Sequence, residues 1–395
     1  MNTIDRAQYD VVISGGGLAA LWLSLQLARA TPWKILIIER MAAAGGMPDA
    51  LSAPSLAFSS ATLHELPSLG VHVSCVPIKT IHVSQSGAFG SSVLSADQQG
   101  VESLGGVVEV APLYRALLDQ VARSDQIEMV NESSLHQMNR SLDSITLDVN
   151  CHGQGTSVDC KLLVAADGHE SATRALLGID VRRSDYGQVA MVTNVQLDQP
   201  NRYCAYERFV ESGPRALLPL SNRRMALIWT VAQDELHAQL EQSKLEWCNR
   251  INDEFHGMLG ANVVDIGHWR TKPLPWMMAR SQVGYRSVLI GNAAHTLHPV
   301  AGQGFNLTAK DLTQLTASLS SVNLSDSAAL TKALSDYQAL REKDQVEVSQ
   351  ACDGLLRLFC SSKRPVRWAR AMGLVVFDHI RPLKSQLVLR AMGAL

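Results

Sequence analysis

Charge of neither sign is in excess in this chain of 395 residues. Its 35 lysines and arginines against 37 aspartates and glutamates give a formal net charge of −2. Proteins that bind nucleic acid usually carry a strong basic excess, so this balance argues against nucleic acid as a partner. The length and the 46% hydrophobic content instead predict a globular protein of about two or three domains.

The cysteines include no CxxC pair. They are scattered along the chain, at Cys75, Cys151, Cys160, Cys204, Cys248, Cys352 and Cys360. An odd and scattered set argues against a disulfide framework and predicts free, buried thiols in a reducing compartment.

One uncharged run, residues 11–28, has the length of a short membrane helix. The ten residues before it hold two acids and one arginine, which is a poor n-region for a signal peptide. Gly15 to Gly17 would also break a spanning helix in its first third. We therefore expect neither a signal peptide nor a membrane helix, and a cytoplasmic protein.

The same run fits the start of a nucleotide-binding fold. Residues 9–14 are typical of a buried parallel strand, residues 18–30 indicate a buried helix, and residues 34–38 indicate a second strand. Strand, glycine turn, helix and strand together make a unit of about thirty residues, the size of a βαβ crossover.

Further along, the pattern predicts a sheet inserted into this core. Residues 71–104 contain a hairpin, residues 107–123 indicate a helix, and residues 186–275 are rich in strands. Residues 287–290 begin a last core strand, and the chain after Gly304 is mostly helical. We expect an α/β fold, in which a Rossmann-like domain is interrupted by an antiparallel β-sheet domain and followed by a helical C-terminal tail. The expected ranges are 1–72, 105–180 and 280–325 for the Rossmann-like domain, 73–104 and 181–279 for the sheet domain, and 326–395 for the tail.

The first motif, Gly15-Gly16-Gly17-Leu18-Ala19-Ala20, is a GxGxxA form of the dinucleotide fingerprint. Gly15 permits a tight turn, Gly17 lets the backbone approach a pyrophosphate, and Ala20 is small enough for helix–strand packing. Glu39, at the end of the second strand, would accept hydrogen bonds from a ribose. A glycine turn can be a mere connection, but the strand before it and the acid after it favour nucleotide binding.

The second motif is Asp167-Gly168, which follows the apolar strand 163–166. It places a carboxylate at the edge of a sheet where ligands bind. The competing interpretation is an ordinary Asp-Gly turn.

The third motif begins at Gly291-Asn292 and continues through a proline-containing loop to Asn306. Glycines before a helix, here Gly302 and Gly304, expose amide donors toward an anion or a polarised carbonyl. His295 and His298 stand three residues apart, but no third ligand of suitable spacing is near, so we expect no metal site.

These three motifs, in this order and separation, resemble the FAD-binding set of the class A flavoprotein aromatic hydroxylases. The resemblance covers most of the chain. The third motif, together with the stretch from Tyr206 to Pro219, is similar to the hydroxylases of ubiquinone biosynthesis, and most to their 2-polyprenyl-6-methoxyphenol (UbiH-type) branch. That branch also has an asparagine where Asn292 stands, and residues 354–359, Gly373 and 384–393 fit the same group.

The resemblance implies FAD as the cofactor and assigns a role to each motif. Gly15, Gly17 and Ala20 would form the pyrophosphate turn, Glu39 would hold the ribose, and Arg115 would pair with a phosphate. Asp167 would lie near the cofactor, and Gly291-Asn292 would contact the ribitol or pyrophosphate. The residues implied to line the flavin ring are Pro299, Gly302, Gln303, Gly304 and Asn306.

The implied reaction uses NAD(P)H and O2 to hydroxylate a polyprenylated phenol through a flavin hydroperoxide. His298 is the candidate general base, and a packed or capping histidine is the competing interpretation. The last 35 residues, 361–395, hold seven lysines and arginines against one acid. They could form a peripheral contact with the inner face of the membrane, an ordinary solvated tail or a surface for other ubiquinone-biosynthesis proteins.

Two positions depart from the family pattern. No arginine stands between Met41 and Arg115, where relatives carry one that contacts the flavin, and Leu307-Thr308-Ala309 replaces the usual Leu-Gly. Two alternatives therefore remain: another FAD oxidoreductase on the same fold, such as an epoxidase or prenyl reductase, or a degenerate flavoprotein that acts as a scaffold.

Overall fold

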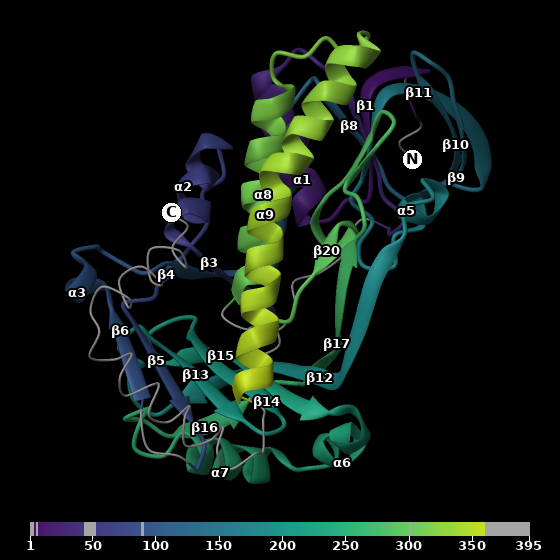
Figure 1. Ribbon diagram of the computed structural model, residues 1–395. Coiled ribbons are helices and arrows are strands. Elements are labelled where there is room, and N and C mark those ends of the chain that lie inside the picture. The colour runs from purple at the N-terminus through teal and green to yellow at the C-terminus, as the bar shows by residue number, and fades with distance from the viewer. Residues whose placement is uncertain (1–3, 5–6, 43–52, 88–90, 300–301, 360–395) are drawn as a thin grey trace.

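Two large sheets and one small sheet lie beside a long helix, α9 (Ser327–Phe359), in the computed structural model (Figure 1). The structure describes the chain except residues 1–3, 5–6, 43–52, 88–90, 300–301 and 360–395. Among the described residues, no helix combines the length and the apolar character needed to cross a membrane.

The first sheet has eight strands with β1 at its centre, in the order β18-β19-β11-β1-β2-β8, and β10 joins β11 to β9. The pairs formed by β1 with β2 and β11, by β2 with β8 and by β11 with β19 are parallel, so these strands end at one edge. The bounds are β1 (Gln8–Ser14), β2 (Ile35–Ile38), β8 (Ile127–Val130), β9 (Ser133–Arg140), β10 (Ile145–Cys151), β11 (Gln154–Ala165), β18 (Val283–Gly284) and β19 (Ser287–Leu289).

Apolar side chains on both faces explain why β1 is central. Val11 and Ile13 face a core with the helix α1 (Leu18–Ala30), whereas Val12 belongs to a second core with β10. Three further helices cover the α1 side: α4 (Val110–Ala122), α8 (Gln303–Leu319) and the first half of α9. The expected βαβ unit is confirmed, and its helix has the predicted bounds.

The second sheet has nine strands in the order β20-β17-β12-β15-β14-β13-β5-β6, with β16 beside β12. It is antiparallel except for the pair β13–β5. The bounds are β5 (Thr80–Gln85), β6 (Ser91–Ser95), β12 (Val181–Leu197), β13 (Cys204–Val210), β14 (Gly213–Pro219), β15 (Arg224–Ala232), β16 (Val263–Ile266), β17 (Arg270–Ala279) and β20 (His295–Thr296).

One face of this sheet packs against α7 (Lys244–Glu254) through Trp229 and Trp247, and the opposite face meets the end of α9. The expected strand-rich stretch 186–275 contains helices that the strand pattern did not predict: η1 (Gln233–Glu235), α6 (Leu236–Leu240) and α7. The sequence does indicate where α7 begins, because Ser243 and Glu246 have the spacing of a capping box and form one in the structure.

A small sheet, β3 (Ser55–Phe58), β7 (Gly106–Glu109) and β4 (Val76–Pro77), connects the two large ones. The helix predicted over 107–123 starts only at Val110, because Val107 to Glu109 pair with β3 and β4. The remaining elements are α2 (Ser60–Ser68), α3 (Ala96–Gln99), α5 (Ala172–Leu176) and η2 (Gly291–Ala293).

Candidate functional site

Three sequence motifs follow strands that end at the same edge of the first sheet. Ser14 of β1 pairs with Ala165 of β11 and with Ile38 of β2, and Ala165 pairs with Leu289 of β19. The residues after these strand ends are Gly15, Glu39, Asp167 and Gly291. Ligands of parallel α/β sheets bind outside this edge, so the candidate site lies here.

Gly15 and Gly17 serve this edge in different ways. Gly15 has φ +106°, and a Cβ there would lie 2.5 Å from the Ala166 carbonyl oxygen, so the turn requires glycine. Gly17 is the N-cap of α1, and a Cβ there would meet no described atom within 4 Å. The first turn of α1 has no side-chain cap and no acidic residue, so its amide groups are available to an anion.

Ala20 is fully buried in the first turn of α1, where a small residue suits helix–strand packing. The preceding residue, Ala19, faces the third motif. A Cβ on Gly291 would lie 3.2 Å from Ala19 Cβ and 3.7 Å from Thr308 Cγ2. The first turn of α1 and the second turn of α8 therefore approach each other at Gly291.

The Glu39 carboxylate is held beside the glycine turn. Its two oxygens accept hydrogen bonds from the Gly16 amide at 2.5 Å and the Met41 amide at 2.7 Å. An ionised carboxylate can accept further hydrogen bonds, so a ribose hydroxyl can still bind. The α4 helix is attached to the same turn, because the Tyr114 hydroxyl donates to the Gly16 carbonyl at 3.1 Å. Its neighbour Arg115 is exposed and makes no hydrogen bond or ion pair with the described residues.

Asp167 lies next to Gly15 but has a local structural task. Its carboxylate accepts hydrogen bonds from the Ser171 hydroxyl and, at 2.9 Å, from the Thr173 amide, which fixes the start of α5. The Asp-Gly turn interpretation thus has direct geometric support, and the next residue, Gly168, takes a left-handed φ of +88° with open space beside it.

A buried ionic network holds the third motif. His295 Nε2 is 2.6 Å from one oxygen of Asp311, and Arg341 Nε donates to the other oxygen at 2.6 Å. All three side chains are almost completely buried. The network joins β20 to α8 and α9, and it gives His295 a carboxylate partner.

The loop after His298 leads into α8, which starts at Gln303 rather than near Asn306. Gly302 is the N-cap with φ +64°, and the first turn of α8 carries no side-chain cap and no acid. Gly304 also faces open space, Pro299 and Asn292 are exposed, and Thr308 donates its hydroxyl to the Gly304 carbonyl at 3.2 Å. The amides at the start of α8 are thus placed to face a ligand.

Asn306 is occupied by structural hydrogen bonds. Its oxygen accepts from the Ser59 amide at 2.9 Å and the Thr62 hydroxyl at 3.0 Å. Its nitrogen donates to the carbonyls of Ala57 at 3.1 Å and Gly302 at 2.8 Å. All four polar positions of this amide are used, so Asn306 shapes the flavin loop through its neighbours.

His298 is buried, with 1% of its surface exposed, and neither ring nitrogen has a hydrogen-bond partner among the described residues. Burial lowers the pKa of His298 to about 4, so the imidazole is neutral near pH 7. Its ring meets the edge of Tyr186 at 5.6 Å between centroids. This environment agrees better with a packed histidine than with a poised base.

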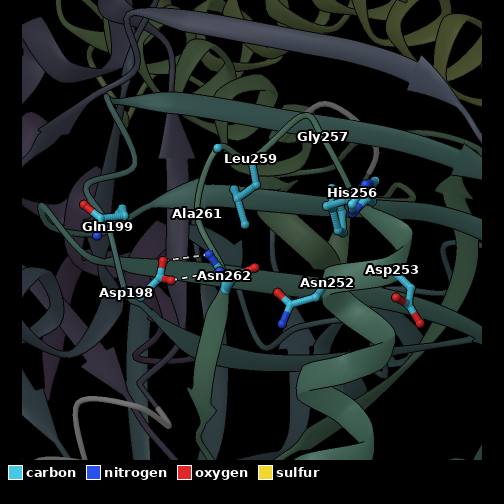
Figure 2. A pocket seen from close by; sticks show the side chains of 11 residues that line it. Asp198, Gln199, Asn252, Asp253, His256, Gly257, Leu259, Ala261 and Asn262 are labelled. Carbon is cyan, nitrogen blue, oxygen red and sulfur yellow. Dashed lines mark hydrogen bonds between the residues drawn. The ribbon is translucent and has the colours of Figure 1, made fainter.

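A cavity of about 440 Å³ lies elsewhere, where α7 ends (Figure 2). Asp198 is one of the acidic residues that line this cavity. Its two carboxylate oxygens accept hydrogen bonds from the Asn262 backbone amide at 2.7 Å and the Asn262 side-chain amide at 2.9 Å. Figure 2 shows Asp198 and Asn262 side by side, near Asn252 and Asp253 at the end of α7. This helix and the end of α9 pack on opposite faces of the second sheet. The cavity is therefore separate from the strand edge.

Comparisons with known proteins agree with the geometry at the strand edge. A family model described as FAD binding domain matches residues 8–349. Ubiquinone hydroxylase UbiL of Rhodospirillum rubrum is 30% identical over 98% of this chain and 90% of its own length. Human ubiquinone biosynthesis monooxygenase COQ6, mitochondrial, is 28% identical over 96% of this chain and 92% of its own length.

The crystal structure of p-nitrophenol 4-monooxygenase PnpA from Pseudomonas putida has the same fold. It superposes with a TM-score of 0.77 at 16% identity, over 98% of this chain and 99% of that one. The chain therefore belongs to the FAD-binding family of flavoprotein hydroxylases, as its three ordered motifs predict.

Proposed function

We propose that this protein is an FAD-dependent monooxygenase that hydroxylates a polyprenylated phenol in ubiquinone biosynthesis. One observation carries the proposal: α1 and α8 both begin without side-chain caps or acids, and their residues Ala19 and Thr308 approach Gly291 beside the carboxyl edge of the first sheet. Two uncapped helix N-termini suit a ligand with a pyrophosphate and an electron-poor ring. The named activities of the two ubiquinone-pathway relatives support the substrate class.

The residues at the edge fit FAD. Gly17 and the first turn of α1 would take the pyrophosphate, Glu39 the adenosine ribose, and exposed Asn292 the ribitol. The start of α8 would face the polar edge of the ring, with Pro299, Gly302, Gln303 and Gly304 around it. Bound there, FAD would supply the redox chemistry for a hydroxylation that uses NAD(P)H and O2.

Other roles from the family pattern need adjustment. Arg115 is exposed, so it would reach a phosphate only from solvent. Asn306 would act by shaping the backbone, because all its polar positions are already used. Asp167 would act in the same way, because it fixes the start of α5. The stretch that would supply the family's loop arginine, Asp49 to Ser52 onward, begins outside the described residues.

We assign FAD binding to the domain of the first large sheet and phenol binding to that of the second. Residues 1–72, 105–180 and 280–325 would bind FAD, and 73–104 with 181–279 would bind the phenol. The face of the second sheet toward α9 is mostly apolar, with Ala205, Leu218 and Ala226 in one cluster, which suits a polyprenyl chain. The tail 326–395 would include the contact with the membrane or with other ubiquinone-biosynthesis proteins.

A visible absorption spectrum of the purified protein is the first test. We expect flavin bands at near-stoichiometric amounts. With NAD(P)H and a short-chain prenylphenol, we expect a product heavier by one oxygen atom. A product without ring oxygen would favour an epoxidase or reductase, and a colourless protein that takes up no FAD would favour the scaffold.

A further inference from the structure

The face of β13 that looks toward α9 carries a single carboxylate, Glu207. Side chains alternate along a strand, so Ala205, Glu207 and Phe209 share this face. Tyr206 and Arg208 point the other way, where Tyr206 donates to the Met258 carbonyl and Arg208 pairs with Glu254.

The surroundings of Glu207 offer its carboxyl group no partner. Its neighbours across the sheet are Val83 on β5 and Ala216 on β14, which have no polar side chains. Among the described residues, none makes a hydrogen bond or ion pair with Glu207, whose side chain is partly exposed. By contrast, Glu254 on the opposite side of the sheet is paired with both Arg208 and Arg215. A carboxylate that is partly exposed on an otherwise apolar face can meet a polar group of a ligand that binds there.

The groups close to Glu207 lie on α9 and on the second sheet. Burial raises the pKa of the Cys352 thiol on α9 to about 11, and the nearby carboxylate of Glu207 contributes to this rise. Cys352 in turn acts electrostatically on Tyr186, whose ring meets His298 at 5.6 Å. Phe209, on the same face as Glu207, stacks on Phe359 at 4.2 Å. Glu207 therefore lies on the side of the second sheet that faces the end of α9, where Tyr186 packs against Phe209, Leu356 and Phe359.

We propose that Glu207 is the catalytic base that binds and deprotonates the substrate phenol, an inference that rests on the proposed function. The phenol O–H bond breaks, the proton passes to a carboxylate oxygen of Glu207, and the electron pair stays on the ring oxygen. The phenolate is richer in electrons at the ring carbons that receive oxygen. Glu207 takes the role first considered for His298, because its carboxylate is a stronger base than this imidazole.

The surroundings predict where the base titrates. Burial raises the pKa of Glu207 to about 8. The base acts as a carboxylate, so the rate of product formation that depends on Glu207 should rise as pH rises through about 8. Burial lowers the pKa of His298 to about 4, and burial together with Asp353 raises the pKa of Tyr186 well above its ordinary value.

Among the residues that the structure describes, α9 also carries charged groups close to this face. Asp353 accepts a hydrogen bond from Tyr186 and is paired with Arg357 at 2.8 Å. With Cys352 titrating near 11, Glu207 is the group expected to change charge around pH 8.

The test compares Glu207→Gln with Glu211→Gln, an exposed glutamate just after the same strand. Both FAD-loaded variants are assayed with a phenol that carries one isoprene unit, by product mass and NAD(P)H consumption. We expect Glu207→Gln to lose about 10²- to 10⁴-fold in product formation, the usual contribution of a general base. Its FAD content should match wild type, and the rise in rate near pH 8 should disappear. Glu207→Asp should retain that rise at a lower rate.

Calorimetry with the same phenol gives a readout that needs no turnover. A phenol ionises near pH 10, above the range of interest. Wild type and Glu211→Gln should bind it more tightly as pH rises through about 8, because a carboxylate accepts a stronger hydrogen bond. Glu207→Gln should bind with no such dependence. If wild type makes no hydroxylated product but shows this difference, the proposed reaction fails and Glu207 remains the phenol-binding group. Equal pH profiles in wild type and Glu207→Gln would overturn the inference.

Discussion

Gly15 and Gly17 show how two residues of one motif can serve different ends. At Gly15 a side chain would collide with the Ala166 carbonyl at 2.5 Å, and the backbone is left-handed. At Gly17 the backbone is extended and a side chain would meet only open space. The fold therefore requires glycine at position 15, whereas at position 17 a glycine leaves room for the ligand proposed to bind there.

We predict that Gly15→Ala lowers the free energy of unfolding of the apoprotein by about 1–3 kcal/mol, the cost of strained backbone. Gly17→Ala should leave that stability nearly unchanged but weaken FAD binding at least tenfold. Chemical denaturation and FAD titration of both variants would separate the effects. Equal FAD affinity in wild type and Gly17→Ala would contradict the proposed pyrophosphate position.

His298 makes a pH-dependent contribution to stability. Its folded-state pKa of about 4 lies below the ordinary value of 6.5, so the unfolded chain binds a proton first as pH falls. Wild type should therefore lose stability between about pH 6.5 and pH 4, by up to about 3 kcal/mol from this residue. Melting curves should show a smaller acid loss in His298→Gln. Parallel curves for the two proteins would mean that His298 is protonated in the folded state.

At the scale of elements, three parts of the chain meet in one buried ionic network. Asp311 on α8 binds His295 on β20 and Arg341 on α9, so removing its charge would leave His295 without its carboxylate and Arg341 with Asp344 alone. We predict that Asp311→Asn costs about 3–5 kcal/mol, as for other buried pairs that lose one partner. Asp336→Asn breaks an exposed pair with Lys332 on the same helix and should cost less than about 0.5 kcal/mol. Denaturant titration measures both, and similar costs would show that the network adds no stability.

The length of each pattern explains which elements were predictable. The βαβ unit follows from about thirty contiguous residues whose apolar period and glycine turn agree. Strand β7 was missed because Val107 to Glu109 continue the apolar pattern of α4, and only their pairing with β3 makes them a strand. Helices α6 and α7 were hidden in a stretch where neighbouring strands dominate the pattern.

At the scale of the whole molecule, α9 connects the two proposed binding units. Leu330 and Tyr337 belong to the core of the first sheet, and Leu356 and Phe359 pack with Phe209 of the second. The helix therefore fixes the proposed flavin and phenol sites relative to each other. The basic segment 361–395 follows it directly in the sequence.

We predict that removing residues 361–395 abolishes flotation with anionic liposomes but leaves FAD content unchanged. Each lysine or arginine near an anionic surface contributes about 1 kcal/mol. Neutral vesicles serve as the control, because the charged contact should be absent there. Failure of the full chain to float with anionic vesicles would end the membrane proposal.

The sequence by itself determined the family, the α/β fold and the strand-end positions of the motifs, because these depend on short contiguous patterns. Only the tertiary structure decided what each polar side chain does. Asn306 makes four hydrogen bonds and Asp167 fixes its own turn, whereas Glu207 has no hydrogen-bond or ion-pair partner in the described part of the chain. Such differences arise from contacts between residues far apart in the chain, whose presence no local pattern of residue types encodes.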